Sequence, residues 1–193
     1  ANQWKDNLMQ NWLEAKSDNA SKFITVNIPS YTLQVWQTEP LTLLMESRVI
    51  VGRQYTKTPL MKTNIVNLKL NPDWSPPPSI KNSKYTPPGP NNPLGMIRFS
   101  TDNNVNIYLH DTNQRSLFNN HERALSHGCV RVESWKNLAM VLSGFTEEDL
   151  DMQLNSKKTK FFTVETTPVF IQYQLYDVVN GKLGLHNDIY KKF

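Results

Sequence analysis

The distribution of proline constrains the fold of this chain more than any other feature. Eight of its twelve prolines lie between residues 72 and 93 of the 193-residue sequence. Proline has a fixed φ and no amide hydrogen to donate, so this segment can form neither a helix nor a central strand. We expect a semi-rigid, extended segment on the surface. Because both flanks have β character, we interpret it as a loop within one domain rather than a linker between two.

Alternating apolar and polar residues predict β-strands on both sides of this loop. Asn180-Gly181 is the strongest hairpin-turn signal in the chain, and Pro168 is expected to interrupt the strand that contains it. The expected strands are residues 23–28, 31–36, 41–51, 94–99, 105–110, 163–176 and 183–189.

Three segments have helical character instead. Residues 3–15 carry an apolar stripe at helical spacing. Residues 135–143 lie between a potential N-cap, Ser134, and a glycine that fits the C-terminal stop, Gly144. A second short helix is expected after Thr146, with acidic residues in its first turn.

Together these elements predict a mostly β fold, a mixed β-sandwich with a few short helices. We expect residues 1–21 to be the helical edge of a preceding region, and residues 22–193 to form one domain. The chain starts at Ala1 with no methionine and no apolar leader, so we interpret it as a piece or a mature form of a longer protein.

Composition excludes several classes of function. A single cysteine rules out a disulfide framework, a multi-cysteine zinc site and a cysteine-ligated iron–sulfur cluster. No stretch approaches 18 consecutive apolar residues, so we expect no membrane span. The formal net charge of +4 suits an anionic partner, but no basic run points to nucleic acid.

The one cysteine, Cys129, lies in the segment Ser-His-Gly-Cys-Val-Arg at residues 126–131, nineteen residues after His110. A free thiol has a pKa of about 8.5, so it needs a neighbouring imidazole to act as a nucleophile at neutral pH. That imidazole needs a third group to fix its tautomer. Gly128 would let the backbone approach a substrate closely, and the charge of Arg131 would favour a thiolate and could hold a substrate carboxylate.

Two other interpretations of these residues stay open. A lone cysteine is more often a small buried apolar residue than a nucleophile, which would leave a non-catalytic binding module. Alternatively, His110, His121, His127 and Cys129 could form a metal site, although their spacing fits no standard zinc pattern.

The combination of His110, a fifteen-residue spacer and Ser-His-Gly-Cys-Val-Arg resembles the signature of the L,D-transpeptidase catalytic domain family. Members of that family build and edit bacterial peptidoglycan. The resemblance extends over roughly residues 22–190 and is to the larger, periplasmic branch in particular. The other segments that carry it are residues 26–33, 49–53, 58–59, 71–77, 88–90, 92–95, 108–112, 168–171 and 188–190.

The resemblance implies a mixed β-sandwich with a cysteine acyl-transfer site. Cys129 would be the nucleophile, and His110, rather than the nearer His127, would be the general base and acid. The backbone carbonyl of Asp111, and not its carboxylate, would orient His110.

Four further roles follow from the same resemblance. The amides of Gly128 and Cys129 would form an oxyanion hole, with help from the hydroxyl of Tyr108. Arg131 would bind or orient the donor peptide, and Trp74 would line the substrate cleft. The family requires no metal and no organic cofactor.

The implied reaction joins two peptidoglycan stem peptides. Cys129 would attack the third-residue carbonyl of a tetrapeptide, release D-alanine and pass the acyl group to a diaminopimelate amine. Carbapenem-type β-lactams would acylate the same thiol, and the implied compartment is the periplasm. An L,D-carboxypeptidase or endopeptidase that uses the same site and a non-catalytic wall-binding module remain the alternatives.

One departure from the resemblance concerns the Pro-rich loop. Larger members carry an inserted lid between the Trp-x-Pro-Pro and Pro-Gly-Pro segments, where this chain has only residues 79–87. We therefore expect a missing or shortened lid and an open cleft.

Overall fold

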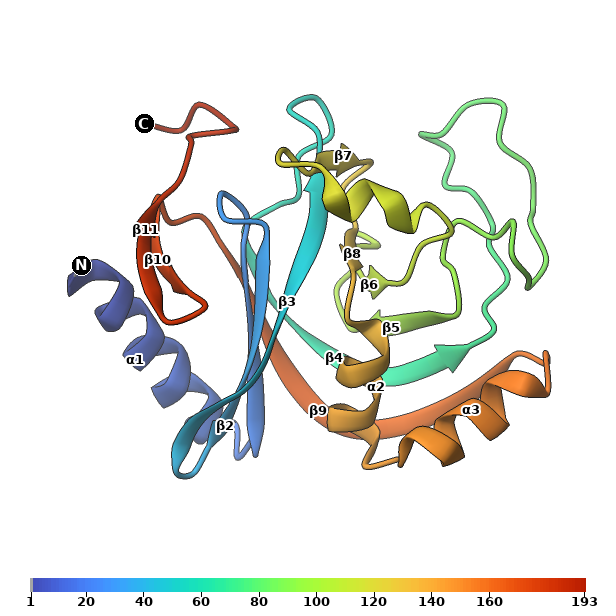
Figure 1. The fold of residues 1–193 in the computed structure, drawn as a ribbon, viewed down its shortest axis with the longest axis horizontal. Helices are drawn as coiled ribbons and strands as arrows, with labels where there is room; N and C mark the ends of the chain where they lie inside the picture. Colours follow the sequence, from blue (N-terminus) through green and yellow to red (C-terminus); the bar gives the residue numbers. More distant parts are fainter. Residues whose placement is uncertain (1) are drawn as a thin grey trace.

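A computed structural model describes residues 2–193 (Figure 1). Within them, nine strands form one mixed sheet in the order β2-β1-β9-β4-β5-β6-β8-β3-β7, and β10 and β11 form a separate hairpin. The strands are β1 (Lys22–Asn27), β2 (Thr32–Thr38), β3 (Leu41–Gly52), β4 (Met61–Leu70), β5 (Ile97–Thr101), β6 (Leu109–His110), β7 (Ala124–Ser126), β8 (Val130–Val132), β9 (Lys160–Gln172), β10 (Tyr176–Val179) and β11 (Lys182–Leu185). The helices are α1 (Asn2–Ser17), α2 (Trp135–Ser143) and α3 (Glu147–Asn155), with a 3-10 helix, η1, at Arg115–Asn119.

The sheet curls back on itself because β2 pairs with β3 as well as with β1. In Figure 1, β4 and β9 run across the lower part of the molecule, and β1, β2 and β3 stand nearly upright beside them. The main hydrophobic core lies inside this curl and takes residues from eight strands and from α2 and α3. The mostly β, mixed-sheet fold is confirmed, and the layers of the expected sandwich are parts of one continuous sheet.

Strand β1 shows how the sequence pattern builds both faces of this sheet. Ile24 and Val26 point into the main core, whereas Phe23, on the other face, packs with Ala15 of α1 and Phe170 of β9. Each strand alternates its side chains between faces, so α1 covers the outer face of β1. The expected helix at the N-terminus therefore packs on the sheet, while its assignment to a preceding region stays a prediction.

Strand β4 was not predicted, and a β-bulge explains why. Its buried residues are Thr63, Ile65, Leu68 and Leu70, and its pairing with both neighbours shifts register between Ile65 and Asn67. One extra residue at a bulge moves the following side chains to the opposite face. The period-two signal is broken in the middle of the strand, although the strand itself continues.

The expected interruption at Pro168 was wrong. Strand β9 runs without a break through this residue, which pairs with Asn64 of β4. On the other side, β1 pairs with β9 only from Val169 onward. Proline is tolerated there because the ladder with β1 begins just beyond it.

Two other local predictions also needed correction. The strand expected at 105–110 is reduced to β6, because Asn103 Oδ1 accepts hydrogen bonds from the Val105 and Ile107 amides and folds this segment into a turn. Helix α2 begins and ends as predicted, but the Ser134 side chain makes no cap hydrogen bond, and its amide donates to Ser47 Oγ.

Three local predictions are confirmed. Gly144 ends α2 in the left-handed conformation, with φ at +74°. The Thr146 hydroxyl caps α3 by accepting from the Asp149 amide at 3.1 Å. Asn180 and Gly181 form the turn between β10 and β11, both with positive φ.

Candidate active site

Three neighbouring strands bring together residues from separate parts of the chain. Arg98 of β5 lies opposite His110 of β6, and His110 lies opposite Arg131 of β8. The next pair along β6 and β8, Leu109 and Val130, is fully buried in the core. Because side chains alternate between faces, Arg98, His110 and Arg131 form a row on the outer face of the sheet.

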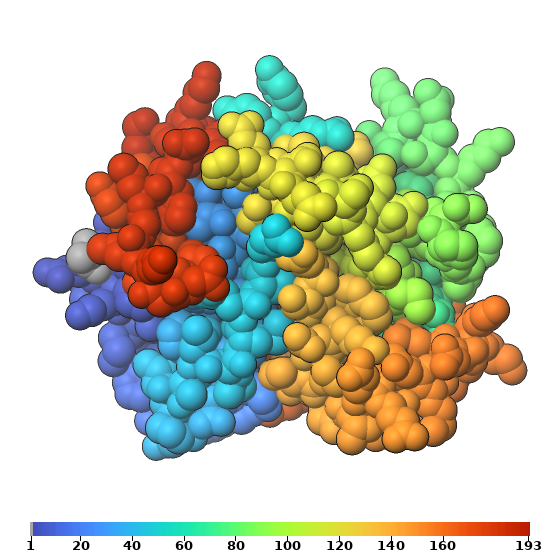
Figure 2. All heavy atoms as spheres, in the orientation of Figure 1, coloured from blue at the N-terminus to red at the C-terminus, as the bar shows by residue number. Residues whose placement is uncertain are grey.

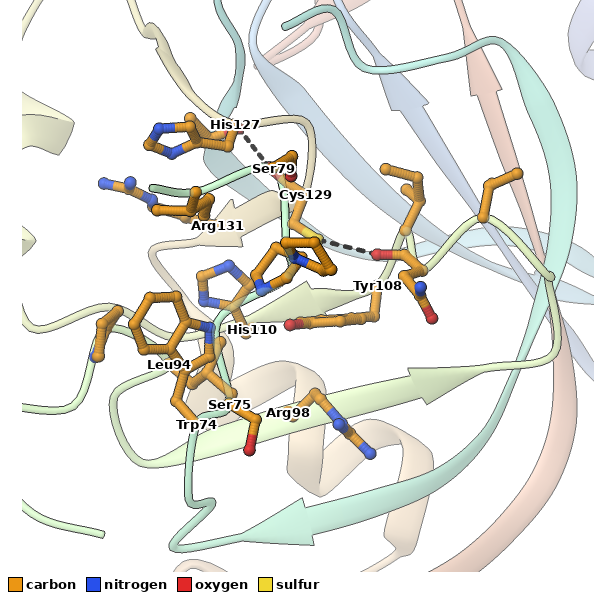
Figure 3. A pocket seen from close by; sticks show the side chains of 18 residues that line it. Trp74, Ser75, Ser79, Leu94, Arg98, Tyr108, His110, His127, Cys129 and Arg131 are labelled. Carbon is orange, nitrogen blue, oxygen red and sulfur yellow. Dashed lines mark hydrogen bonds between the residues drawn. The ribbon is translucent and has the colours of Figure 1, made fainter. Parts of the chain in front are cut away.

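This row opens onto a cavity of about 500 Å³ (Figure 3). Tyr108 and Cys129, which precede His110 and Arg131 by two residues, line the same cavity. A further wall comes from the Pro-rich loop, through Trp74 and residues 77–80. Figure 2 shows this loop (green) beside the segment that follows β6 (yellow) on the surface of the molecule.

Hydrogen bonds at its base hold the Pro-rich loop in place. The backbones of Trp74 and Thr86 form an antiparallel bridge, with N···O distances of 2.8 and 2.9 Å. The fully buried side chain of Asn92 donates to three carbonyls at the base, including that of Pro72 at 2.8 Å. The loop is therefore tethered, and its residues 77–80 are kept at the cavity.

A tight turn presents Cys129, which is half-buried. Ser126 Oγ donates to the Cys129 carbonyl at 2.6 Å and accepts from the Gly128 amide at 3.1 Å. Gly128 has a φ of +130°, and a Cβ on it would lie 3.3 Å from Ile107 Cδ1, so the turn requires glycine. Cys129 Sγ lies 3.4 Å from the carbonyl oxygen of Asn106.

The polar loop that follows β3 supports this turn from behind. The hydroxyl of Thr58 donates to the Gly128 carbonyl at 2.7 Å, and the hydroxyl of Thr56 donates to the Ser126 carbonyl at 2.8 Å. The Ser126 and Gly128 carbonyls are thus bound by side chains about seventy residues away in sequence. These two hydrogen bonds hold the backbone of the turn just before Cys129.

Burial decides the protonation state of the thiol. It raises the pKa of Cys129 to about 11, although a hydrogen bond with the Tyr108 backbone and the charges of Arg131 and Arg98 act in the opposite direction. The expected effect of Arg131 is therefore present but smaller than that of burial. At neutral pH the group is a thiol, not a thiolate.

His110 is held by the residue that follows it. Its Nδ1 is hydrogen-bonded to the backbone carbonyl of Asp111. A carbonyl oxygen can only accept, so Nδ1 carries the proton and Nε2 keeps its lone pair. Burial lowers the pKa of His110 to about 3; the bond to Asp111 opposes this, and the charges of Arg131 and Arg98 add to it. At neutral pH the imidazole is neutral, with an unprotonated Nε2.

The carboxylate of Asp111 has other partners. It is fully buried, accepts from the Met96 amide at 2.8 Å and pairs with Arg115 at 2.6 Å. Gly95 lies so close that a side chain there would overlap the Asp111 carboxyl group. The carboxylate fixes the strand end, and the carbonyl is left to contact His110.

Tyr108 packs beside His110. The two ring centroids are 5.8 Å apart, and the guanidinium of Arg98 lies over the Tyr108 ring, 5.2 Å from its centroid. Burial raises the pKa of Tyr108 to about 12, so its hydroxyl keeps its proton and can donate to an oxyanion.

The other histidines differ from His110 in their surroundings. His127 lines the cavity, but within residues 2–193 no hydrogen bond fixes its ring; burial lowers its pKa. His121 is exposed, and His186 is hydrogen-bonded to Asp177. Across residues 2–193, no group of three or more His, Cys, Asp or Glu side chains is placed to hold a metal ion. No helix in that range is long and apolar enough to cross a membrane.

The structure brings the predicted site residues together. Five of the seven line the cavity: Trp74, Tyr108, His110, Cys129 and Arg131. Gly128 and Asp111 lie behind Cys129 and His110. Sequence reasoning missed Ser126, Thr58 and Arg98. Ser126 stands in the motif itself and Thr58 in one of the short segments that carry the family resemblance, whereas nothing in the spacing marks Arg98.

Comparison with known proteins identifies the family. The L,D-transpeptidase catalytic domain family matches residues 21–170. This chain belongs to that family. A Haemophilus influenzae protein, named as a candidate L,D-transpeptidase, is 33% identical over 215 residues, which cover 86% of this chain and 44% of that protein. This chain thus matches less than half of the length of that protein.

Among solved structures, L,D-transpeptidases are similar to this chain. One from Mycobacterium smegmatis has 14% identity and a TM-score of 0.50, covering 79% of this chain and 58% of that one. The catalytic domain of an Enterococcus faecium L,D-transpeptidase acylated by ertapenem has 13% identity and a TM-score of 0.47. That match covers 79% of this chain and 97% of the other.

Proposed function

We propose that this domain is a peptidoglycan L,D-transpeptidase that works through a covalent Cys129 thioester. One observation carries the proposal: the only cysteine of the chain and a histidine with a fixed tautomer line the same cavity. A neutral imidazole whose Nε2 lone pair is free is the base that a protonated thiol needs.

Acylation starts from two neutral groups. As Cys129 Sγ attacks the third-residue carbonyl of the donor tetrapeptide, His110 Nε2 takes the thiol proton. The S–C bond forms and the carbonyl becomes an oxyanion. When the C–N bond to the terminal D-alanine breaks, His110 returns its proton to the leaving amine. A thioester remains on Cys129.

In the second half of the reaction, an acceptor amine attacks the thioester and Cys129 is the leaving group. The side-chain amine of diaminopimelate in a second stem attacks the thioester, and His110 accepts a proton from that amine. The C–S bond breaks, the thiol regains its proton, and an amide joins the two third residues. No metal or organic cofactor takes part in this scheme.

Of the donors expected to bind the oxyanion, the Gly128 amide is already engaged in another hydrogen bond. The Gly128 amide already donates to Ser126 Oγ, so it serves the turn in this arrangement. The Cys129 amide and the protonated hydroxyl of Tyr108 are the donors that remain for the oxyanion. Arg131 would hold the donor peptide, and Trp74 would form the wall that the peptide contacts.

The acceptor decides between the main function and its nearest alternative. If water reached the thioester, the same site would be an L,D-carboxypeptidase or endopeptidase. The Pro-rich loop that borders the cavity is short, and we expect it to leave the cleft accessible to a second stem peptide. A periplasmic location is part of the proposal, as the peptidoglycan substrate requires an extracytoplasmic site.

Two assays test this proposal. The chain is incubated with a disaccharide tetrapeptide, and products are identified by mass spectrometry; a dimer joined between third residues is the expected result. In parallel, intact mass is measured after addition of a carbapenem. We expect an adduct on the parent, none on Cys129→Ala, and acylation slower by about 100-fold or more in His110→Gln. His121→Gln and His127→Gln are the matched controls.

Other results would change the assignment. Tripeptide without dimer would favour the carboxypeptidase. An untouched tetrapeptide, no carbapenem adduct, and retention on isolated cell-wall sacculi would favour a wall-binding module. An adduct on Cys129→Ala, or an undiminished rate in His110→Gln, would contradict the mechanism.

A further inference from the structure

Two arginines face the active-site cavity without a carboxylate partner. Arg131 Nη1 donates to Gln114 Oε1 at 3.3 Å, and Arg98 Nε donates to Ser100 Oγ at 3.2 Å. Both partners are neutral. The ion pairs that arginines form within residues 2–193 involve other arginines, elsewhere in the fold.

The cavity is cationic as a whole. Among the described residues that line it, Arg98 and Arg131 carry a positive charge and none is Asp or Glu. The hydrogen bond from Lys69, at 2.5 Å, is the main cause that lowers the pKa of Asp73, and the charge of Arg98 adds to it, so this carboxylate already has a partner. Unpaired guanidinium groups that are partly removed from water favour an anionic ligand.

The sheet register separates the two charges. Arg98 and Arg131 are the outer members of the row that has His110 at its centre, so their backbones are roughly 10 Å apart, twice the spacing of neighbouring strands. Figure 3 shows their guanidinium groups pointing in different directions, with His110 between them. The cavity thus has a cation on each side of the reacting groups.

A donor tetrapeptide has carboxylates that fit this arrangement. The terminal D-alanine carboxylate lies one residue beyond the carbonyl that Cys129 attacks, and Arg131 is only two residues from Cys129 in an extended segment. The second carboxylate of diaminopimelate stands at the end of a long side chain, which suits the more distant Arg98.

We infer that Arg98 binds the side-chain carboxylate of the third residue, and that it selects donors in which this carboxylate is free over those in which it is amidated. This inference rests on the function proposed above. It makes Arg98 a specificity-determining residue, with a role separate from that of Arg131.

The test uses two tetrapeptides that differ at one group. Their third residue is diaminopimelate or its side-chain monocarboxamide, and release of D-alanine gives kcat and KM for each. We expect the parent to prefer the free carboxylate by roughly 10- to 100-fold in kcat/KM, as a charge-assisted hydrogen bond predicts. Arg98→Gln is expected to reduce this preference to within about 3-fold, mainly by raising KM for the free-carboxylate donor.

Two variants act as controls. Arg98→Lys keeps the charge and is expected to restore part of the preference. Arg48→Gln removes an exposed arginine that pairs with Glu133 and is not among the residues that line the cavity, and it is expected to leave the preference unchanged. A general loss of structure would slow both donors equally and would not change their ratio.

The outcomes separate the two proposals. An undiminished preference in Arg98→Gln, or a parent that processes both donors equally well, overturns the inference and leaves the proposed function intact. A parent that releases D-alanine from neither donor and forms no carbapenem adduct contradicts the proposed function, and the inference fails with it.

Discussion

The hydroxyl of Thr58 connects the end of β3 to the turn that carries Cys129: it accepts from the Gly52 amide at 2.8 Å and donates to the Gly128 carbonyl at 2.7 Å. The Thr58 amide itself donates to the buried hydroxyl of Tyr190 at 3.1 Å, near the C-terminus. Three distant parts of the chain therefore meet behind the reactive thiol.

Replacing Thr58 tests this connection. Thr58→Val keeps the shape of the side chain but leaves a buried donor and a buried acceptor unpaired, which costs about 1–3 kcal/mol of unfolding free energy. We also expect carbapenem acylation to slow by roughly 10-fold, because the turn loses its support. Chemical denaturation and stopped-flow acylation provide the measurements. Thr58→Ser keeps the hydroxyl and should stay near the parent; equal losses in both variants would point to packing instead.

The variant Asp111→Asn tests whether the backbone carbonyl or the carboxylate of Asp111 is the group that supports His110. The substitution removes the charge that pairs with Arg115 and keeps an acceptor for the Met96 amide. We expect a loss of about 1–3 kcal/mol in stability but acylation within roughly 10-fold of the parent, because the backbone carbonyl still orients His110. A catalytic carboxylate would instead cost about 10⁴-fold in rate. Acylation kinetics at a temperature where both proteins are folded decide between the two.

The turn at Gly128 should tolerate no side chain. In Gly128→Ala, a φ of +130° is strained and the new Cβ presses on Ile107. We expect a loss of about 1–3 kcal/mol in stability and at least a 100-fold slower acylation. Gly89→Ala is a matched control, since its φ is +144° but no atom lies within 4 Å of the added Cβ. If both variants acylated at the parent rate, the turn would not be the constraint described here.

The thiol should react with alkylating agents only slowly at neutral pH. Because burial raises the pKa of Cys129 to about 11, the thiolate fraction keeps increasing well above the ordinary pKa of a free thiol. The rate of iodoacetamide alkylation is therefore expected to rise steadily up to about pH 10 in the folded protein. The same chain in urea should level off near pH 9, and an equally early plateau in the folded state would contradict the assigned pKa.

His110 should make the fold sensitive to acid. Its pKa is lowered to about 3 in the folded state, so between pH 6.5 and pH 3 the unfolded chain binds a proton that the folded chain does not. Stability is therefore complete above about pH 6.5 and decreases as the pH falls. We expect the Tm to drop by roughly 4–8 °C between pH 7 and pH 5. In His110→Gln this part of the drop should be absent, which differential scanning calorimetry measures.

The sequence predicted most of the elements whose side-chain pattern is regular. The hairpin at Asn180-Gly181, helix α2 and the early strands follow from local signals that the structure retains. Strand β4 escaped detection because its bulge reverses the alternation between Ile65 and Leu68. Pro168 was misjudged because its tolerance depends on where β1 begins to pair, which is a property of the sheet and not of the strand.

The sequence also predicted only part of the candidate site. Cys129 and His110 stand in a motif that the family resemblance made visible. The contacts of Thr58 and Arg98 were not predictable, because each forms only in the folded chain: Thr58 contacts a turn seventy residues later, and Arg98 is placed by its register against His110. Long-range contacts of this kind leave no periodic trace in the sequence.

Burial of the thiol has a consequence for the survival of the protein as well as for its chemistry. Disulfide exchange and oxidation proceed through the thiolate, and a pKa of about 11 leaves only about one Cys129 in ten thousand in that form at pH 7. In an oxidising compartment, a lone cysteine with an ordinary pKa would form mixed disulfides with its neighbours. Under the proposed mechanism, burial keeps the sulfur reduced by keeping it protonated, and acyl transfer begins only when a donor occupies the cavity next to His110.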